Sequence, residues 1–237
     1  MSDQPALEFP DLDTLRARRT ALLDRIVDVG GDPDQVEILA VTKRFPVRAV
    51  ELAVAAGFAS VGENYAQELI EKAAQFRVVA ERAADSGTAL PVPRWHMIGG
   101  LQRNKVKKLA GVASVFQTID RVELAAEVAK RAPGAEVYVQ VNTTDEGQKS
   151  GCAPSSAAGL VAVCRSEGLA VSGLMTVGPT DGSDPTPAFE TLRSLADTCS
   201  VRGLSMGMSG DIEQAVRCGS TMIRVGSALF GPRPTNL

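Results

Sequence analysis

Short apolar runs alternate regularly with longer segments of helical spacing along almost the whole chain. Residues 38–41 form the clearest run. They are continuously apolar, which is typical of a strand buried on both faces. We expect eight strands, at residues 37–42, 58–63, 94–99, 114–119, 136–141, 171–177, 204–209 and 222–226. Seven helices are expected between them, at residues 47–56, 66–84, 102–109, 122–131, 155–167, 186–199 and 211–218.

Eight strands that alternate with helices in 237 residues predict an α/β fold of the (β/α)8 TIM barrel type. An extra helix at residues 11–29 is expected to pack on the barrel, and residues 1–10 are expected to be flexible. No linker-like segment divides the chain, so we expect one domain over residues 1–237. A doubly wound open sheet is the alternative. It usually has fewer strands and carries a glycine fingerprint after the first strand, which AVTKRF lacks.

Composition argues against several classes of protein. The formal net charge is -3 with 22% charged residues, which does not suit a protein that coats nucleic acid or an anionic membrane. No apolar stretch approaches the about 20 residues that span a bilayer, and the amino terminus lacks signal-peptide features. We therefore expect a cytoplasmic protein that binds neither nucleic acid nor membrane. Four widely spaced cysteines and a single histidine argue against a structural zinc site or a disulfide framework.

Charged residues interrupt the apolar pattern near the ends of two strands. Lys43 follows the first strand, and in TIM barrels the carboxyl ends of the strands carry the active site. A partly desolvated lysine there retains some free amine, which condenses with carbonyl groups. A solvated lysine, or one paired with Glu63, is the alternative. Arg224 lies within the last strand, where a buried guanidinium needs an acid, an anion or a ring acceptor.

Small and hydroxylated residues follow the last two strands. Gly226 and Ser227 come after the eighth strand, and Ser209 and Gly210 come after the seventh. In TIM barrels these loops often bind phosphate through backbone N–H groups, although turns and close packing also explain such glycines. An amine, a planar donor and a phosphate site together fit pyridoxal 5'-phosphate (PLP). An aldolase for a phosphorylated sugar would use the same lysine and loops without a cofactor.

Eight short motifs occur in order between about residues 38 and 231: LAVTK, VGENYAQE, WHMIGGLQRNK, TID, VNTTDEGQKSG, GLMT, MGMSGD and GSTMIRVGSALFG. Together they resemble the pyridoxal phosphate homeostasis family, also called the proline-synthase co-transcribed proteins. The resemblance covers nearly the whole chain, and its specificity lies in the combination because each motif alone is weaker. It implies a single-domain barrel of the alanine racemase N-terminal type, which is fold type III among PLP proteins.

The resemblance also implies which residues hold the cofactor. Lys43 is similar to the family's internal-aldimine lysine, and Arg224 to the residue that donates to the pyridine nitrogen. The other matched positions are Ser209, Gly226 and Ser227 as phosphate ligands, and Asn64 and His96 in motifs that line the cofactor pocket. Ser227 stands where the family often has threonine, which keeps a hydroxyl group. For His96, a buried core side chain beside Trp95 is the alternative.

The function that the resemblance implies is a reversible PLP carrier or buffer in intracellular vitamin B6 homeostasis, without strong catalytic activity. An arginine partner leaves the pyridine nitrogen largely neutral, which limits electron-sink chemistry. Racemisation also needs a second base, which alanine racemases take as a tyrosine from a carboxyl-terminal domain. This sequence ends six residues after Gly231, so we expect no such domain, and its only tyrosines are Tyr65 and Tyr138. A weak PLP-dependent amino-acid racemase, or a related PLP enzyme, is the alternative.

The expected partners are PLP and PLP-dependent apoenzymes, and the expected oligomeric state is a monomer. Two features have no assigned role. Lys149 lies in the loop after the fifth strand, where a surface lysine is the favoured interpretation. Residues 178–187 are rich in proline, glycine and aspartate, which fits either a lid over the barrel mouth or a simple connector.

Overall fold

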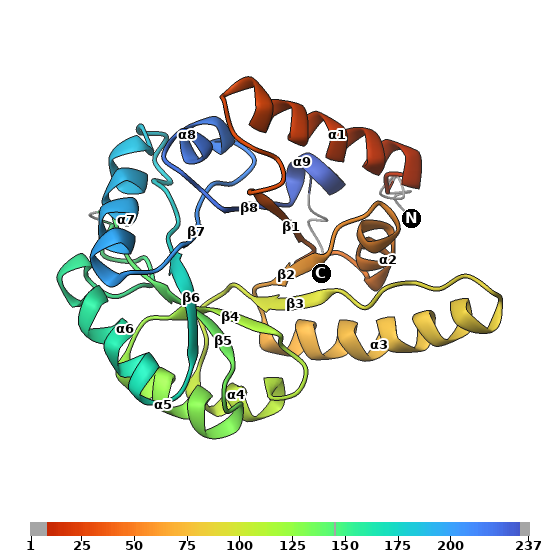
Figure 1. Cartoon of the computed structure of the whole chain (residues 1–237). Coiled ribbons are helices and arrows are strands. Elements are labelled where there is room, and N and C mark those ends of the chain that lie inside the picture. Colours follow the sequence, from red (N-terminus) through yellow and green to blue (C-terminus); the bar gives the residue numbers. More distant parts are fainter. Residues whose placement is uncertain (1–8, 145, 233–237) are drawn as a thin grey trace, which may run out of the picture.

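Eight parallel strands close into a barrel in sequence order, with β1 hydrogen-bonded to β8 (Figure 1). The computed structural model describes residues 9–144 and 146–232, so most of the segment expected to be flexible, residues 1–10, lies outside the described residues. The strands are β1 (Glu37–Val41), β2 (Ser60–Glu63), β3 (Arg94–Met97), β4 (Val115–Ile119), β5 (Glu136–Gln140), β6 (Ala170–Met175), β7 (Gly203–Ser205) and β8 (Met222–Val225). The predicted TIM barrel is confirmed, and the doubly wound open sheet is wrong.

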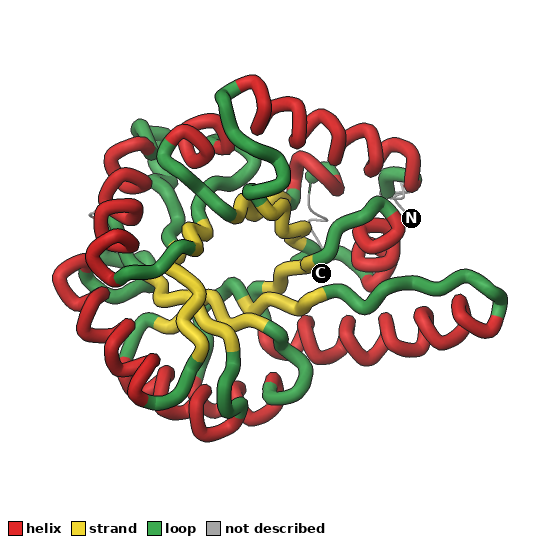
Figure 2. Tube along the Cα trace, in the orientation of Figure 1, coloured by secondary structure: helices red, strands yellow, loops and turns green. Residues whose placement is uncertain are grey.

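Helices form an outer ring around the strands (Figure 2). They are α1 (Leu12–Asp28), α2 (Val47–Ala55), α3 (Ala66–Asp85), α4 (Arg103–Leu109), α5 (Val122–Arg131), α6 (Ala157–Ser166), α7 (Thr186–Cys199), α8 (Ile212–Arg217) and α9 (Ser227–Phe230). The predicted bounds agree within two residues, but a short 3-10 helix (Pro154–Ser156) forms the start of the segment expected to be helical at residues 155–167. The four-residue helix α9 was not among the expected helices.

The extra amino-terminal helix packs on the outside of the barrel, as expected. Asp11 begins α1, because its side chain accepts a hydrogen bond from the backbone N–H of Thr14 at 2.8 Å. Leu15, Leu22 and Ile26 form the buried face of α1. This helix lies beside α8 and α9, while α3 and the segment that follows it extend outward on another side (Figure 1).

The core has two parts because each strand is buried on both faces. On β1, Ile38 and Ala40 face the helices and join the larger hydrophobic cluster. Leu39 points the other way and packs in a small cluster inside the barrel, together with Val115, Tyr138, Met175 and Met222. Burial on both sides explains the continuous apolar run in the sequence.

Strand β7 is shorter than predicted. The pattern predicted a strand at residues 204–209, but β7 ends at Ser205. Gly207 adopts a φ of 96°, in the left-handed region, which turns the chain out of the extended conformation. Ser209 therefore lies in the β7–α8 loop. This loop stays beside β8 because the N–H of Arg224 donates to the carbonyl oxygen of Gly207 at 2.9 Å.

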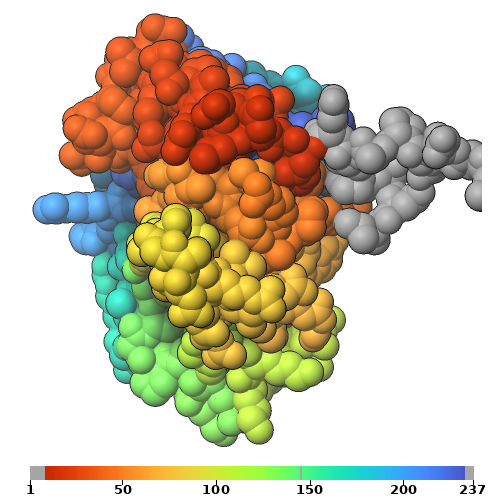
Figure 3. Space-filling view, turned by 90° about the vertical axis from the view of Figure 1, so that its right-hand side faces the viewer, coloured from red at the N-terminus to blue at the C-terminus, as the bar shows by residue number. Residues whose placement is uncertain are grey.

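The helices α1, α2 and α3 cover neighbouring parts of the outer surface, which Figure 3 shows in red to yellow. Among residues 9–144 and 146–232, no helix combines the length and apolar character needed to cross a membrane.

Candidate functional site

A cavity of about 360 Å³ lies at the carboxyl ends of the barrel strands, within the size range of small-ligand sites. It is lined by six of the seven residues predicted to bind a cofactor: Lys43, Asn64, Ser209, Arg224, Gly226 and Ser227. Gly210, predicted to share the phosphate loop with Ser209, lines the same cavity. The barrel thus brings an amine, a guanidinium and two hydroxyl groups together from the ends of three strands, β1, β7 and β8.

Arg224 is the most deeply placed of the charged residues in this cavity, with 6% of its surface exposed. Its Nη1 donates to the carbonyl oxygen of Ser205 at 2.7 Å and to the hydroxyl of Ser205 at 2.8 Å. Its Nη2 donates to the carbonyl oxygen of Thr176 at 2.7 Å. Burial lowers the pKa of Arg224 to about 10, and the charge of Asp211 opposes that shift. The guanidinium therefore remains charged at neutral pH while neutral oxygen atoms fix its orientation.

Helix α1 helps to hold the loop that carries Ser209, a contribution that sequence reasoning missed. Arg25 donates to both carboxylate oxygens of Glu213, at 2.6 and 2.9 Å, and to the carbonyl oxygen of Ser209 at 3.4 Å. The Ser209 hydroxyl in turn accepts hydrogen bonds from Ser227 Oγ at 3.3 Å and from the N–H of Ala228 at 3.4 Å. The two loops predicted to bind phosphate are therefore joined to each other and to the extra helix.

Gly226 has a packing reason to be glycine. A Cβ at this position would lie 3.2 Å from the carbonyl oxygen of Val41 on β1. Gly99 is more restricted, because a Cβ there would lie 2.2 Å from the carbonyl oxygen of Asn64. Close packing of the backbone beside Val41 and Asn64 thus shapes the cavity wall, which supports the close-packing interpretation of Gly226.

The backbone on both sides of Lys43 is held by hydrogen bonds from neighbouring elements. The carbonyl oxygen of Thr42 accepts from Lys72 Nζ at 2.6 Å, and its hydroxyl donates to Glu63 Oε1 at 2.5 Å. The N–H of Arg44 donates to Glu68 Oε1 at 2.5 Å, and Arg44 has a φ of 62°, an uncommon value for a residue with a side chain. These contacts fix the position from which the Lys43 side chain reaches the cavity.

Glu63 pairs with Lys72 behind the cavity wall. The Glu63 side chain is fully buried and Lys72 is 5% exposed, and Lys72 Nζ lies 2.7 Å from Glu63 Oε1 and 2.7 Å from Glu68 Oε1. The sequence contained a signal for this pair. Lys72 occupies a core-facing position of α3, at helical spacing from Leu69 and Phe76, where an apolar residue is normal.

The Glu63→Gln substitution is expected to remove part of the pH dependence of stability. Burial raises the pKa of Glu63 to about 7, although Lys72 and Thr42 oppose this shift. The folded protein therefore holds this proton more tightly than the unfolded chain, in which the carboxyl titrates near 4.5. This contribution to stability is full below pH 4.5 and is lost as the pH rises through 7.

Urea unfolding of wild type and Glu63→Gln, between about pH 4 and pH 8, measures this effect. Relative to the variant, the wild type should lose stability as the pH rises. A difference in unfolding free energy that does not depend on pH would contradict the raised pKa.

His96 does not line the cavity. It points into the barrel interior, where Gln117 Nε2 lies 2.7 Å from His96 Nδ1, and its surface is fully buried. Burial lowers the pKa of His96 to about 3, with a further contribution from the charge of Arg94. Ile98, two residues later on the same side of the chain, lines the cavity instead. This position fits the buried core side chain that was the alternative for His96.

Lys149 and the loop at residues 178–187 interact with each other outside the cavity. Lys149 Nζ donates to the carbonyl oxygen of Gly178 at 2.6 Å and pairs with Glu146 Oε1 at 2.6 Å. Glu146 also accepts hydrogen bonds from the Thr180 N–H at 3.1 Å and the Thr180 hydroxyl at 2.5 Å. Lys149 is thus half-buried rather than a free surface lysine, and it ties the start of this loop to the loop after β5.

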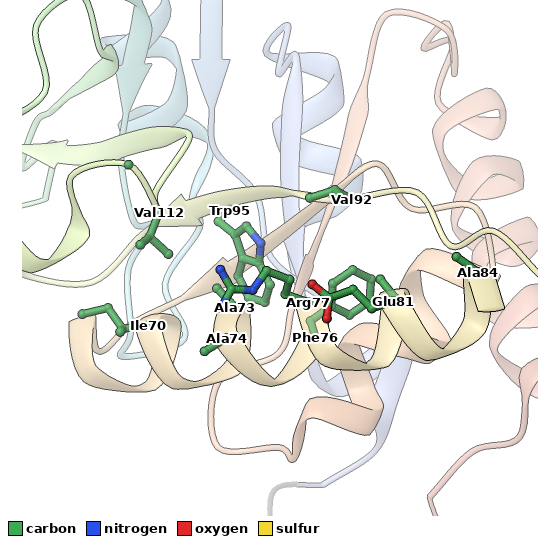
Figure 4. Close-up of a pocket in the computed structure, with 12 residues that line it drawn as sticks. Ile70, Ala73, Ala74, Phe76, Arg77, Glu81, Ala84, Val92, Trp95 and Val112 are labelled. Carbon is green, nitrogen blue, oxygen red and sulfur yellow. The ribbon is translucent and has the colours of Figure 1, made fainter.

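A larger groove of about 580 Å³ runs along the outside of the barrel between α3 and β3. Figure 4 shows that Phe76 and Trp95 form its floor, with Arg77 and Glu81 on the same helix. The two rings pack edge to face with centroids 6.4 Å apart. This groove contains none of the predicted cofactor residues and lies away from the carboxyl ends of the strands, so we assign the candidate site to the smaller cavity.

Comparison with known proteins agrees with this geometry. The sequence matches the family model described as alanine racemase, N-terminal domain, over residues 11–234. A relative from Mycobacterium tuberculosis, named pyridoxal phosphate homeostasis protein, is 36% identical over 253 aligned residues, which cover 98% of this chain and 96% of that protein. The chain belongs to the pyridoxal phosphate homeostasis family. The family resemblance drawn from the motifs is therefore confirmed.

Two solved structures have the same fold as this chain. A protein of unknown function from Bifidobacterium adolescentis has a TM-score of 0.82 and 32% identity, covering 92% of this chain and 95% of that chain. PipY from Synechococcus elongatus, solved with PLP bound, has a TM-score of 0.72 and 29% identity, covering 89% of this chain and all of PipY. The predicted barrel of the alanine racemase N-terminal type is thus confirmed.

Proposed function

We propose that this protein binds PLP reversibly in the cavity at the carboxyl ends of the strands and acts as a PLP carrier or buffer. The convergence of six predicted residues on one cavity carries this proposal. Its relatives are named pyridoxal phosphate homeostasis proteins, and PipY has been solved with PLP bound. The lining groups suit PLP chemically, because an amine, a guanidinium and hydroxyl groups match an aldehyde, a ring nitrogen and a phosphate.

Each lining residue has a proposed part in binding. Bound PLP would supply an electrophilic aldehyde, and Lys43 would supply the amine that can react with such a carbonyl group. Arg224 would donate to the ring nitrogen. Ser209 and Ser227 would offer their hydroxyl groups to the phosphate, and Asn64 lines the same cavity as Lys43.

The side chains around the cavity favour binding over catalysis. Arg224 remains charged and cannot accept a proton from the ring nitrogen, which limits the stabilisation of a carbanion. Racemisation needs a second base opposite the lysine. Neither tyrosine of the chain lines the cavity, since Tyr138 is buried in the barrel interior and Tyr65 is 51% exposed elsewhere.

Titration of the cofactor-free, untagged protein with PLP tests the proposal. A visible absorption band should appear and should disappear on dialysis against an acceptor apoenzyme, which should gain activity. Exchange of the Cα hydrogen of amino acids in deuterated water should stay at the rate given by the same concentration of free PLP. Exchange well above that rate would favour the racemase alternative, and absence of PLP binding would overturn both.

Arg224→Ala should weaken PLP binding by about 5- to 150-fold, the equivalent of about 1 to 3 kcal/mol for a hydrogen bond from a charged group. Arg224→Lys should also weaken binding, because an ammonium group lacks the planar donor arrangement. Equilibrium dialysis measures both affinities, and thermal unfolding reports whether each variant remains folded. An unchanged affinity in a folded Arg224→Ala variant would remove Arg224 from the site.

The cytoplasmic location, the monomeric state, the single domain and the transfer of PLP to apoenzymes are further parts of this proposal. Size-exclusion chromatography with light scattering measures the oligomeric state directly, and the apoenzyme assay above measures transfer.

A further inference from the structure

A continuous series of side-chain hydrogen bonds crosses the barrel interior from Arg224 to His96. Arg224 Nη1 donates to Ser205 Oγ at 2.8 Å. Ser205 Oγ lies 2.7 Å from Gln117 Oε1, and Gln117 Nε2 lies 2.7 Å from His96 Nδ1. All four residues are buried, and they come from β8, β7, β4 and β3. We call these four residues the interior relay.

Arg224 fixes the direction of the first bond in the interior relay, and the contacts of Gln117 with Ser205 and Met222 give the direction of the others. A guanidinium only donates, so Ser205 Oγ accepts from Arg224 and its own hydrogen is directed to Gln117 Oε1. The amide nitrogen of Gln117 then faces His96 and donates to Nδ1. Gln117 Nε2 also lies 3.0 Å from Met222 Sδ, which favours a donor over an oxygen atom at that place.

The same reasoning gives the tautomer of His96. A nitrogen that accepts a hydrogen bond carries no hydrogen, so Nδ1 is bare and the imidazole hydrogen sits on Nε2. Protonation of His96 would place two donors face to face at Nδ1. Burial independently keeps the ring neutral.

We propose that Ser205 and Gln117 are positioning residues that fix the Arg224 guanidinium against the ligand cavity and hold His96 as the neutral tautomer with its hydrogen on Nε2. Ser205 accepts hydrogen bonds from Nη1 of Arg224, and the Thr176 carbonyl oxygen accepts one from Nη2. The Nε edge of Arg224 is the part that we assign to a ligand. His96 acts through the interior relay and touches no ligand. The part that concerns ligand affinity rests on the proposed binding of PLP.

The chain has a single histidine, so the nitrogen resonances of its imidazole report on the interior relay without assignment. We expect the NMR spectrum of the untagged, cofactor-free protein to show the Nε2–H tautomer, with no titration between about pH 5 and pH 8. Gln117→Met, which keeps the side chain's length but removes the donor, should move the Nδ1 resonance toward that of an unbonded nitrogen. A wild-type His96 that carries its hydrogen on Nδ1, or that titrates in this range, would overturn the interior relay.

Ser205→Ala tests positioning, and Ser220→Ala is its matched control. Ser220 is also buried, but within the described part of the chain its hydroxyl bonds to backbone carbonyl oxygens alone, including those of Met206 at 2.7 Å and Met222 at 3.1 Å. Ser205→Ala should shift or broaden the His96 Nδ1 resonance and weaken PLP binding about two- to tenfold. Ser220→Ala should leave both unchanged.

The two readouts separate this inference from the proposed function. If the wild type shows the expected tautomer but binds no PLP, the proposed function fails and the interior relay stands. If PLP binds but a folded Ser205→Ala variant matches Ser220→Ala in affinity and in the His96 spectrum, the positioning role is wrong. Thermal unfolding of each variant establishes that it is folded, and Gln117→Met provides a second variant that breaks the interior relay at another bond.

Discussion

Lys43→Ala is expected to abolish covalent capture of PLP while the barrel remains folded. The Lys43 side chain is half-buried and lines the cavity. The other described residues that line this cavity include no lysine, so none of them can replace its amine. The fold should tolerate the change because hydrogen bonds of Thr42 and of the Arg44 N–H hold the backbone on both sides of this position. The expected loss is complete, since an alanine cannot form an imine.

Borohydride reduction of the PLP-loaded protein, followed by intact mass measurement and peptide mapping, tests this expectation. The wild type should carry one reduced PLP on Lys43, and Lys43→Ala should carry none. Lys149→Ala is the matched control. Lys149 is also half-buried and also follows a barrel strand, but it bonds to Gly178 and Glu146 outside the cavity. A reduced adduct that persists in Lys43→Ala, or that disappears in Lys149→Ala, would refute the assignment.

Lys72→Met should lower the free energy of unfolding by about 3 to 5 kcal/mol, the usual cost of removing one partner from a buried ion pair. Glu63 is fully buried, and Lys72 supplies its only charged hydrogen-bond donor among the residues that the structure describes. Lys72 also bonds to the carbonyl oxygen of Thr42, so the substitution removes a contact beside Lys43 as well. The loss should be smaller at acid pH, where Glu63 is protonated and needs no counter-charge.

Urea unfolding at about pH 9, above the pKa of Glu63, measures this change. Lys130→Met, on the exposed surface of α5, should change stability by less than about 0.5 kcal/mol. The double variant Lys72→Met with Glu63→Gln should recover much of the loss, because a neutral amide costs less to bury than an unpaired carboxylate. A Lys72→Met protein as stable as Lys130→Met would show that the buried pair contributes little.

The sequence was sufficient to predict which residues of the site lie at the strand ends, but not how deeply each side chain is placed in the barrel. Lys43 and Arg224 stand out because a charge interrupts or ends an apolar run, which is a local signal. His96 also lies on a predicted strand, but the sequence does not show its depth. His96 and Ile98 both point inward, and His96 lies one layer deeper than Ile98, the residue directly after β3 that reaches the cavity.

The sequence by itself determined the alternation of strands and helices, and hence the barrel and the end of it that carries the cavity. These features depend on the spacing of apolar residues within short segments. Only the tertiary structure decided which polar residues meet. Ser205 and Gln117 are 88 residues apart, and Arg25 and Glu213 are 188 residues apart. Such contacts arise when the barrel closes and brings distant strands and helices together, which no local pattern encodes.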